Sequence, residues 1–70
     1  MKMQKVESSN IDEIGYDEEN KVLRIAFKHS NSYEYSNFSK EDFEAFVASS
    51  SKGSFFYRNI LKNYHATKIN

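Results

Sequence analysis

The hydrophobic pattern of this chain changes its period once, at Phe38 and Ser39. Before this point apolar residues recur at every second position, which is typical of strands that are buried on one face. After it they recur at every third or fourth position, which is typical of an amphipathic helix. One such change predicts an α+β fold in which the strands come first and the helices follow.

Three segments before the change are predicted to be strands: Ile11–Asp17, Lys21–Lys28 and Tyr33–Phe38. Gly15 interrupts the first, which indicates a bulge or the close approach of another backbone. Short turns separate the three segments, so we expect a three-stranded antiparallel meander. The second segment has the clearest alternation, with one face formed by Leu23, Ile25 and Phe27.

Two helices are expected to follow, which completes a βββαα order. Ser39 is the expected N-cap of the first, with Asp42 three residues later in a near capping box. Gly53 is expected to end this helix in the left-handed conformation. Ser54 then caps a second helix, and the tail 65–70 is expected to be frayed. One face of the second helix carries Phe56, Ile60 and Tyr64.

The composition limits the classes of protein that this chain can belong to. Its 70 residues form one domain, 1–70, with an expected ordered core at about 6–65. Cysteine is absent, which excludes disulfides and thiolate metal sites. His29 and His65 are far apart in sequence, so we expect no metal and no cofactor. No apolar run approaches the roughly 18 residues of a membrane span, and we expect a cytoplasmic protein of a bacterial cell.

Charge is distributed unevenly along the chain. Residues 1–49 hold all ten acids and six of the ten bases, a net charge of −4. Residues 50–70 hold no acid and have a net charge of +4, from Lys52, Arg58, Lys62 and Lys68. Such a basic end favours phosphate or an acidic partner, although a solvated helix face is the more common explanation of a charge block.

The segment Ser51–Tyr64 is therefore the candidate binding site. It combines four aromatic rings with three cations, and Arg58 and Lys62 are spaced one helical turn apart. Arginine binds phosphate through a bidentate fork and lysine binds it as a point charge. An ordinary turn with caps explains Ser51–Ser54 better than a phosphate cradle does. The residues predicted to contact phosphate or base are Lys52, Gly53, Ser54, Tyr57, Arg58, Lys62 and His65.

Exposed rings beside these cations would stack on nucleic-acid bases. Phe55 and Tyr57 are adjacent and cannot both face one core, so at least one is expected to be partly exposed. Tyr33 and Tyr35 on the third strand could likewise be exposed, on a surface of the sheet. Core packing is the alternative for each ring. No histidine has a serine, cysteine or carboxylate partner at a catalytic spacing, so we predict no catalytic residue and no enzyme.

The chain as a whole resembles the KTSC family, a short domain named for its occurrence at the end of some lysyl-transfer-RNA synthetases. The family also occurs as a stand-alone protein in bacteria and phages. The turn His29–Ser32 lacks the glycine, and Phe38–Lys40 the proline, that the family often has there. The matching residues are Val6, Ser8-Ser9-Asn10-Ile11, Ile14-Gly15-Tyr16-Asp17, Leu23, Ile25, Phe27, Tyr33, Tyr35, Ser51, Gly53, Phe56, Ile60 and Tyr64.

The resemblance implies RNA binding without catalysis, and it assigns no functional residues. Our leading hypothesis is a non-enzymatic module that binds RNA through its basic, aromatic C-terminal helix. The alternative is a homo-oligomer, plausibly phage-encoded, that sequesters a small or cyclic nucleotide at its subunit interfaces. A third hypothesis is a protein–protein adaptor. None of the three involves a membrane.

Overall fold

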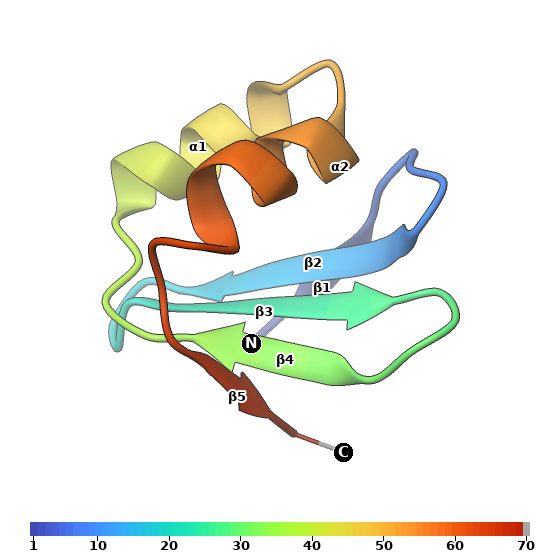
Figure 1. Ribbon diagram of the computed structural model, residues 1–70. Helices are drawn as coiled ribbons and strands as arrows, with labels where there is room; N and C mark the ends of the chain where they lie inside the picture. The colour runs from blue at the N-terminus through green and yellow to red at the C-terminus, as the bar shows by residue number, and fades with distance from the viewer. Residues whose placement is uncertain (70) are drawn as a thin grey trace.

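The computed structural model describes residues 1–69, which form one antiparallel sheet with all helices on one of its faces (Figure 1). The strand order β1-β2-β3-β4-β5 follows the chain. None of the described helices has the length and hydropathy that a membrane span requires. The strands are β1 (Met3–Lys5), β2 (Ile11–Asp17), β3 (Val22–Phe27), β4 (Ser32–Tyr35) and β5 (Ala66–Lys68). The helices are α1 (Lys40–Ala48), α2 (Lys52–Phe55) and the π-helical turn η1 (Phe56–Ile60), which continues α2.

The α+β class is confirmed, and the three predicted strands are present as β2, β3 and β4. The predicted three-stranded sheet was incomplete, because β1 and β5 add one strand at each edge. The tail that we expected to be frayed contains β5, whose backbone pairs with the free edge of β4 from Tyr33 to Tyr35. Both added strands have three residues, which is too short for an alternating pattern to be visible, and both lie outside 6–65.

Gly15 allows the close approach of β1. It pairs with Met3, and a Cβ atom added to Gly15 would lie 2.5 Å from the Met3 sulfur and 3.0 Å from the backbone oxygen of Lys2. The bulge of β2 lies elsewhere, where the register with β3 shifts between Ile11 and Glu13. Of the two explanations for Gly15, the close backbone approach is therefore the one that holds.

The start of α1 is confirmed and the start of the second helix is corrected. The Ser39 hydroxyl accepts a hydrogen bond from the backbone N–H of Asp42 at 3.0 Å. Gly53 does not end α1, because it lies inside α2 and has no positive φ. The break comes earlier, at Ser49 and Ser51, which are both extended. Ser51, and not Ser54, caps α2 by accepting from the N–H of Ser54 at 3.2 Å.

The core lies between the sheet and the helices. Phe46 of α1 and Ile60 of η1 are fully buried, and Phe38 fills the space at the link between sheet and helix. Phe56 lies edge-on to Tyr35, with ring centroids 6.0 Å apart, so η1 is held over the middle of the sheet. The predicted inward face of the second helix is confirmed, since Phe56 and Tyr64 pack against this cluster. The other buried residues come from the central strands: Ile11, Ile14, Leu23, Ile25 and Tyr35.

Candidate nucleic-acid interface

An apolar groove of about 390 Å³ lies between η1 and strands β3 to β5. Alternation along β4 places Tyr33 and Tyr35 on the same face, the one that the helices cover. Ala66 of β5 stands opposite Tyr35, and its small side chain leaves this part of the sheet open. We call this the aromatic groove, and it is lined by Phe27, Ser30, Tyr33, Tyr35, Phe56, Leu61 and Ala66.

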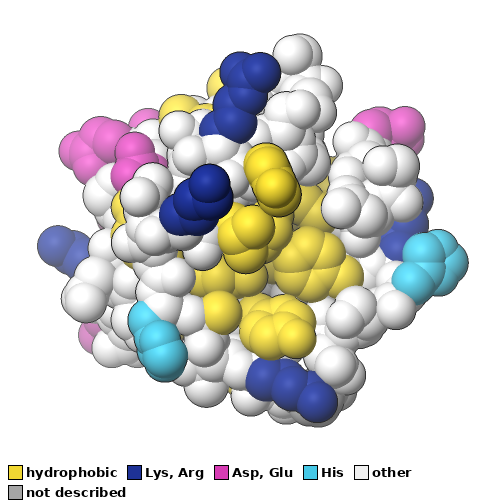
Figure 2. Space-filling model, in the orientation of Figure 1, with side chains coloured by type: hydrophobic (Ala, Val, Ile, Leu, Met, Phe, Trp, Pro, Cys, Tyr) yellow, Lys and Arg dark blue, Asp and Glu magenta, His cyan; other side chains and the backbone are white. Residues whose placement is uncertain are grey.

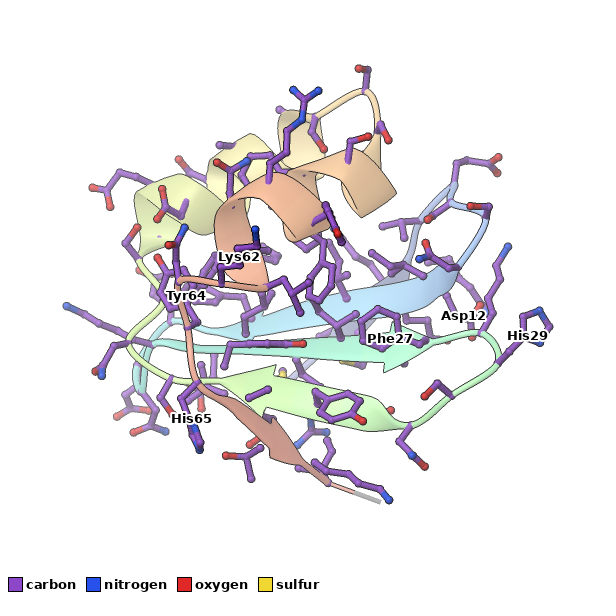
Figure 3. All side chains as sticks on the ribbon, viewed as in Figure 1. Asp12, Phe27, His29, Lys62, Tyr64 and His65 are labelled. Atoms are coloured by element: carbon purple, nitrogen blue, oxygen red, sulfur yellow. The ribbon has the colours of Figure 1, made fainter. Side chains whose placement is uncertain are left out.

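Cationic side chains border the aromatic groove. Lys68 is the cross-strand neighbour of Tyr33, so both side chains lie on the groove face of the sheet. Lys62 follows Leu61 on the helical side and points toward the viewer (Figure 3). Figure 2 shows a hydrophobic patch with Lys or Arg side chains above and below it, whereas acidic side chains lie only near the margins of this view. The face is therefore apolar at its centre and basic around it.

A second hollow, of about 400 Å³, lies beside the first turn of α2. Four of the predicted site residues, Gly53, Ser54, Tyr57 and Arg58, line it together. Sequence reasoning missed the other side, which comes from the loop before β2. The carboxamide oxygen of Asn10 is 3.3 Å from the position of a Cβ atom on Gly53. We call this the polar hollow, and it is lined by Ser9, Asn10, Ser51, Gly53, Ser54, Tyr57 and Arg58.

The remaining predicted site residues lie apart from the polar hollow. The Lys52 ammonium group donates to the backbone oxygen of Ser49 at 2.7 Å, so it satisfies the end of α1. Phe55 stacks on buried Phe46 with ring centroids 5.2 Å apart, and its ring is half-buried. His65 is exposed in the link to β5, below η1 in Figure 3, and not on a helix face with Arg58 and Lys62.

The predicted stacking rings differ in exposure, because Tyr57 is open to solvent, Tyr33 is half-buried and Tyr35 is buried. Tyr57 is 64% exposed and Leu61 is 45% exposed, and the two are one helical turn apart. The prediction that Phe55 or Tyr57 would be exposed is thus confirmed for Tyr57. Burial, with a smaller contribution from repulsion by the Tyr33 phenolate, raises the pKa of Tyr35 to about 12. Tyr35 therefore remains a neutral phenol in the groove at physiological pH.

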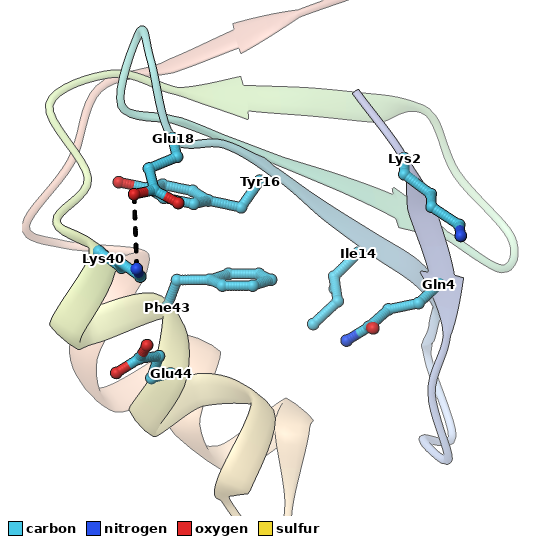
Figure 4. Close-up of a pocket in the computed structure, with 8 residues that line it drawn as sticks. All are labelled: Lys2, Gln4, Ile14, Tyr16, Glu18, Lys40, Phe43 and Glu44. Atoms are coloured by element: carbon cyan, nitrogen blue, oxygen red, sulfur yellow. Dashed lines mark ion pairs between the residues drawn. The ribbon is translucent and has the colours of Figure 1, made fainter.

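A third hollow lies on another side, between β1, β2 and α1 (Figure 4). It has a volume of about 440 Å³, and Tyr16 stacks on Phe43 within it at a centroid distance of 4.9 Å. Lys40 pairs with Glu18 across it at 3.4 Å. With Lys2 and Glu44 its lining has two cations and two acids, so its charge favours no class of ligand. No cluster of metal-binding side chains occurs among residues 1–69.

The family model of the KTSC domain matches residues 7–64. The chain belongs to the KTSC family. The crystal structure of a KTSC domain protein from Yersinia pestis is similar to it, with a TM-score of 0.96 and 35% sequence identity, over 99% of this chain and 97% of that chain. No curated protein matches the sequence. The KTSC match contains every residue of the polar hollow, whereas β1 and β5 lie outside it.

Proposed function

We propose that this KTSC protein is a non-enzymatic module that binds single-stranded RNA across the aromatic groove. The observation that supports the proposal is the combination of an aromatic-lined groove, the neighbouring exposed ring of Tyr57 and cations on one face. Proteins that bind single strands stack bases on aromatic side chains and neutralise the backbone with Lys and Arg. Half-buried Tyr33 supplies a ring in the groove, buried Tyr35 forms part of its floor, and Lys62 and Lys68 supply charge on its two sides.

The charges set the expected strength of binding. Arg58, Lys62 and Lys68 could each contact one phosphate, which is a small number for a nucleic-acid-binding protein. Each phosphate contact with a single strand contributes about 0.7 to the slope of log affinity against log salt concentration. The protein should therefore bind RNA modestly at low salt and lose this affinity as salt is added.

The double variant Arg58→Ala/Lys62→Ala tests the proposal. Both side chains are exposed, so the fold should be retained, which the amide NMR spectrum can verify. We expect weaker binding of a short single-stranded RNA in fluorescence anisotropy, with a salt slope lower by about 1.4. Lys5→Ala/Lys40→Ala is the matched control, because it removes the same charge from exposed ion pairs outside the groove. Equal affinities of the two double variants at low salt would contradict the proposal.

A homo-oligomer that encloses a small nucleotide is the second candidate. The exposure of Tyr57, Leu61 and Val47 favours it, because large apolar side chains at a surface are suited to a subunit contact. Sedimentation and native mass spectrometry with mononucleotides and cyclic nucleotides test this candidate. A monomer under all conditions would reject it. A protein adaptor would be indicated instead if neither RNA nor nucleotide shifted any amide resonance while a protein ligand did.

A further inference from the structure

The polar hollow gathers hydrogen-bond donors around one unpaired cation. None of the described residues that line it is acidic. The two arginines of the chain differ in this respect. Arg24 binds Glu34 through two nitrogens, at 2.6 and 3.0 Å, whereas Arg58 forms no ion pair within residues 1–69. The guanidinium group of Arg58 therefore keeps its capacity to bind an anion.

A small hydrogen-bond network supplies a donor to the carboxamide oxygen of Asn10. The Ser8 hydroxyl oxygen accepts from the N–H groups of Asn10 and Ile11, at 3.4 and 3.2 Å. Its own proton is thus left for the Asn10 carboxamide oxygen, at 3.1 Å. The amide nitrogen of Asn10 donates to no other group within residues 1–69, so it keeps its capacity to donate to a ligand.

The serine at the start of α2 is oriented in a similar way. The Ser51 oxygen already accepts from the backbone N–H of Ser54, so its proton is available to another acceptor. Ser9, Ser54 and Tyr57 add further hydroxyl groups to the lining. The hollow therefore offers side-chain donors and a positive charge, which is the environment that a phosphate requires.

The number of donors favours a terminal phosphate over an internal one. A phosphate monoester has three terminal oxygens and a charge of about −1.5 to −2 at pH 7. An internal diester has two free oxygens and a single charge, and it would use fewer of the donors. The volume of about 400 Å³ lies within the roughly 300–1,000 Å³ that is usual for small-ligand sites. The hollow can thus admit a phosphate together with part of its nucleotide.

We infer that the polar hollow binds the terminal phosphate of an RNA strand whose bases lie along the aromatic groove. This inference rests on the proposed RNA binding. Tyr57 lines the hollow, and Leu61, one helical turn later, lines the groove, so the two sites adjoin. The exposed ring of Tyr57 is placed to stack on the terminal base.

The test compares one internally labelled oligonucleotide in three forms: with a 5′-phosphate, with a 3′-phosphate, or with hydroxyl groups at both ends. We expect one phosphorylated form to bind about 10- to 100-fold more tightly, as a charged hydrogen bond would give. Arg58→Gln, which removes the charge but keeps a polar side chain, should remove this preference. Lys62→Ala should weaken all three forms equally. The preference should also decline below about pH 6, where the monoester gains a proton.

The outcomes separate the hollow from the groove. Equal binding of all three forms would overturn the terminal-phosphate site and leave RNA binding in place. If no form binds, the proposed function fails. NMR titration with uridine 5′-monophosphate, compared with uridine, then tests whether the polar hollow binds phosphate independently of RNA. Shifts at residues 9–10 and 51–58 with the monophosphate alone would support a phosphate site. The absence of such shifts would overturn it.

Discussion

The hydroxyl of Tyr64 donates a hydrogen bond to the Asp42 carboxylate, with 3.0 Å between the two oxygens. Asp42 lies in the first turn of α1 and Tyr64 follows η1, so this bond joins the beginning of one helical segment to the end of the other. The Tyr64 ring also packs on Phe38, at a centroid distance of 4.7 Å. Burial and the bond to Asp42 both raise the pKa of Tyr64, which keeps the hydroxyl a donor at neutral pH.

Two substitutions at Tyr64 should separate these contributions. Tyr64→Phe removes the hydroxyl and should lower the free energy of unfolding by about 1 kcal/mol, as for one exposed hydrogen bond. Tyr64→Ala also removes the ring from Phe38 and should cost about 3 kcal/mol. Urea denaturation measures both values. Equal losses would show that the ring contributes no packing energy.

Ser39→Ala should destabilise α1 through the loss of its N-cap. The serine oxygen satisfies the N–H of Asp42, and the loss of such a cap costs about 1 kcal/mol. Ser50→Ala is the matched control, since Ser50 is exposed and makes no side-chain hydrogen bond within the described residues. Thermal unfolding should show a lower midpoint for the first variant alone. A similar shift in both would argue against the cap.

Gly15→Ala should detach β1 from β2. The added methyl group would meet the sulfur of Met3, which can move, and the backbone oxygen of Lys2, which cannot move unless β1 shifts. We expect faster hydrogen exchange of the β1 amides and a loss of about 1–3 kcal/mol in stability. Gly53→Ala is the control, because its methyl group would lie no closer than 3.3 Å to its nearest neighbour, a side-chain oxygen of Asn10, and alanine favours the helix. Unchanged exchange in β1 would contradict this account.

Stability should fall at high pH through Tyr35. Its pKa is raised to about 12 in the folded state, whereas an unperturbed tyrosine has a pKa of about 10. The folded state therefore holds this proton more tightly than the unfolded state does. The resulting stabilisation is complete below about pH 10 and is lost as the pH rises toward 12. Tyr35→Phe lacks the phenol, so its stability should fall less over this range. If the plots of unfolding free energy against pH are parallel for the two proteins, the raised pKa of Tyr35 is refuted.

The parts of the fold that could be predicted are those with a long local pattern. The alternation of β3 extends over six residues, and the N-cap of α1 can be recognised from Ser39 and its neighbours alone. β1 and β5 are too short for such a pattern, and they form because an adjacent strand offers unpaired backbone groups. The prediction that α1 ends at Gly53 was wrong, because the extended serines before it, Ser49 and Ser51, had already ended this helix.

Only one side of the polar hollow was predictable from the sequence, the side formed by residues 51–58. Gly53, Ser54, Tyr57 and Arg58 do meet in one hollow, because the continuous helical segment of α2 and η1 carries them. Asn10 is distant in sequence, and no local rule connects it to Gly53. The ordered match to the KTSC family contained both segments and was the available indication. Alternation placed Tyr33 and Tyr35 on one face, but the burial of Tyr35 depended on Phe56, which packs edge-on against it from η1.

The two edges of the sheet bear on how copies of this protein could assemble. β1 and β5 are each three residues long and each carries a lysine, Lys5 or Lys68. Short, charged edges discourage strand-to-strand addition between molecules. Any association of copies should therefore be a closed one through side chains such as Leu61, and concentrated solutions should not form amyloid-like fibres.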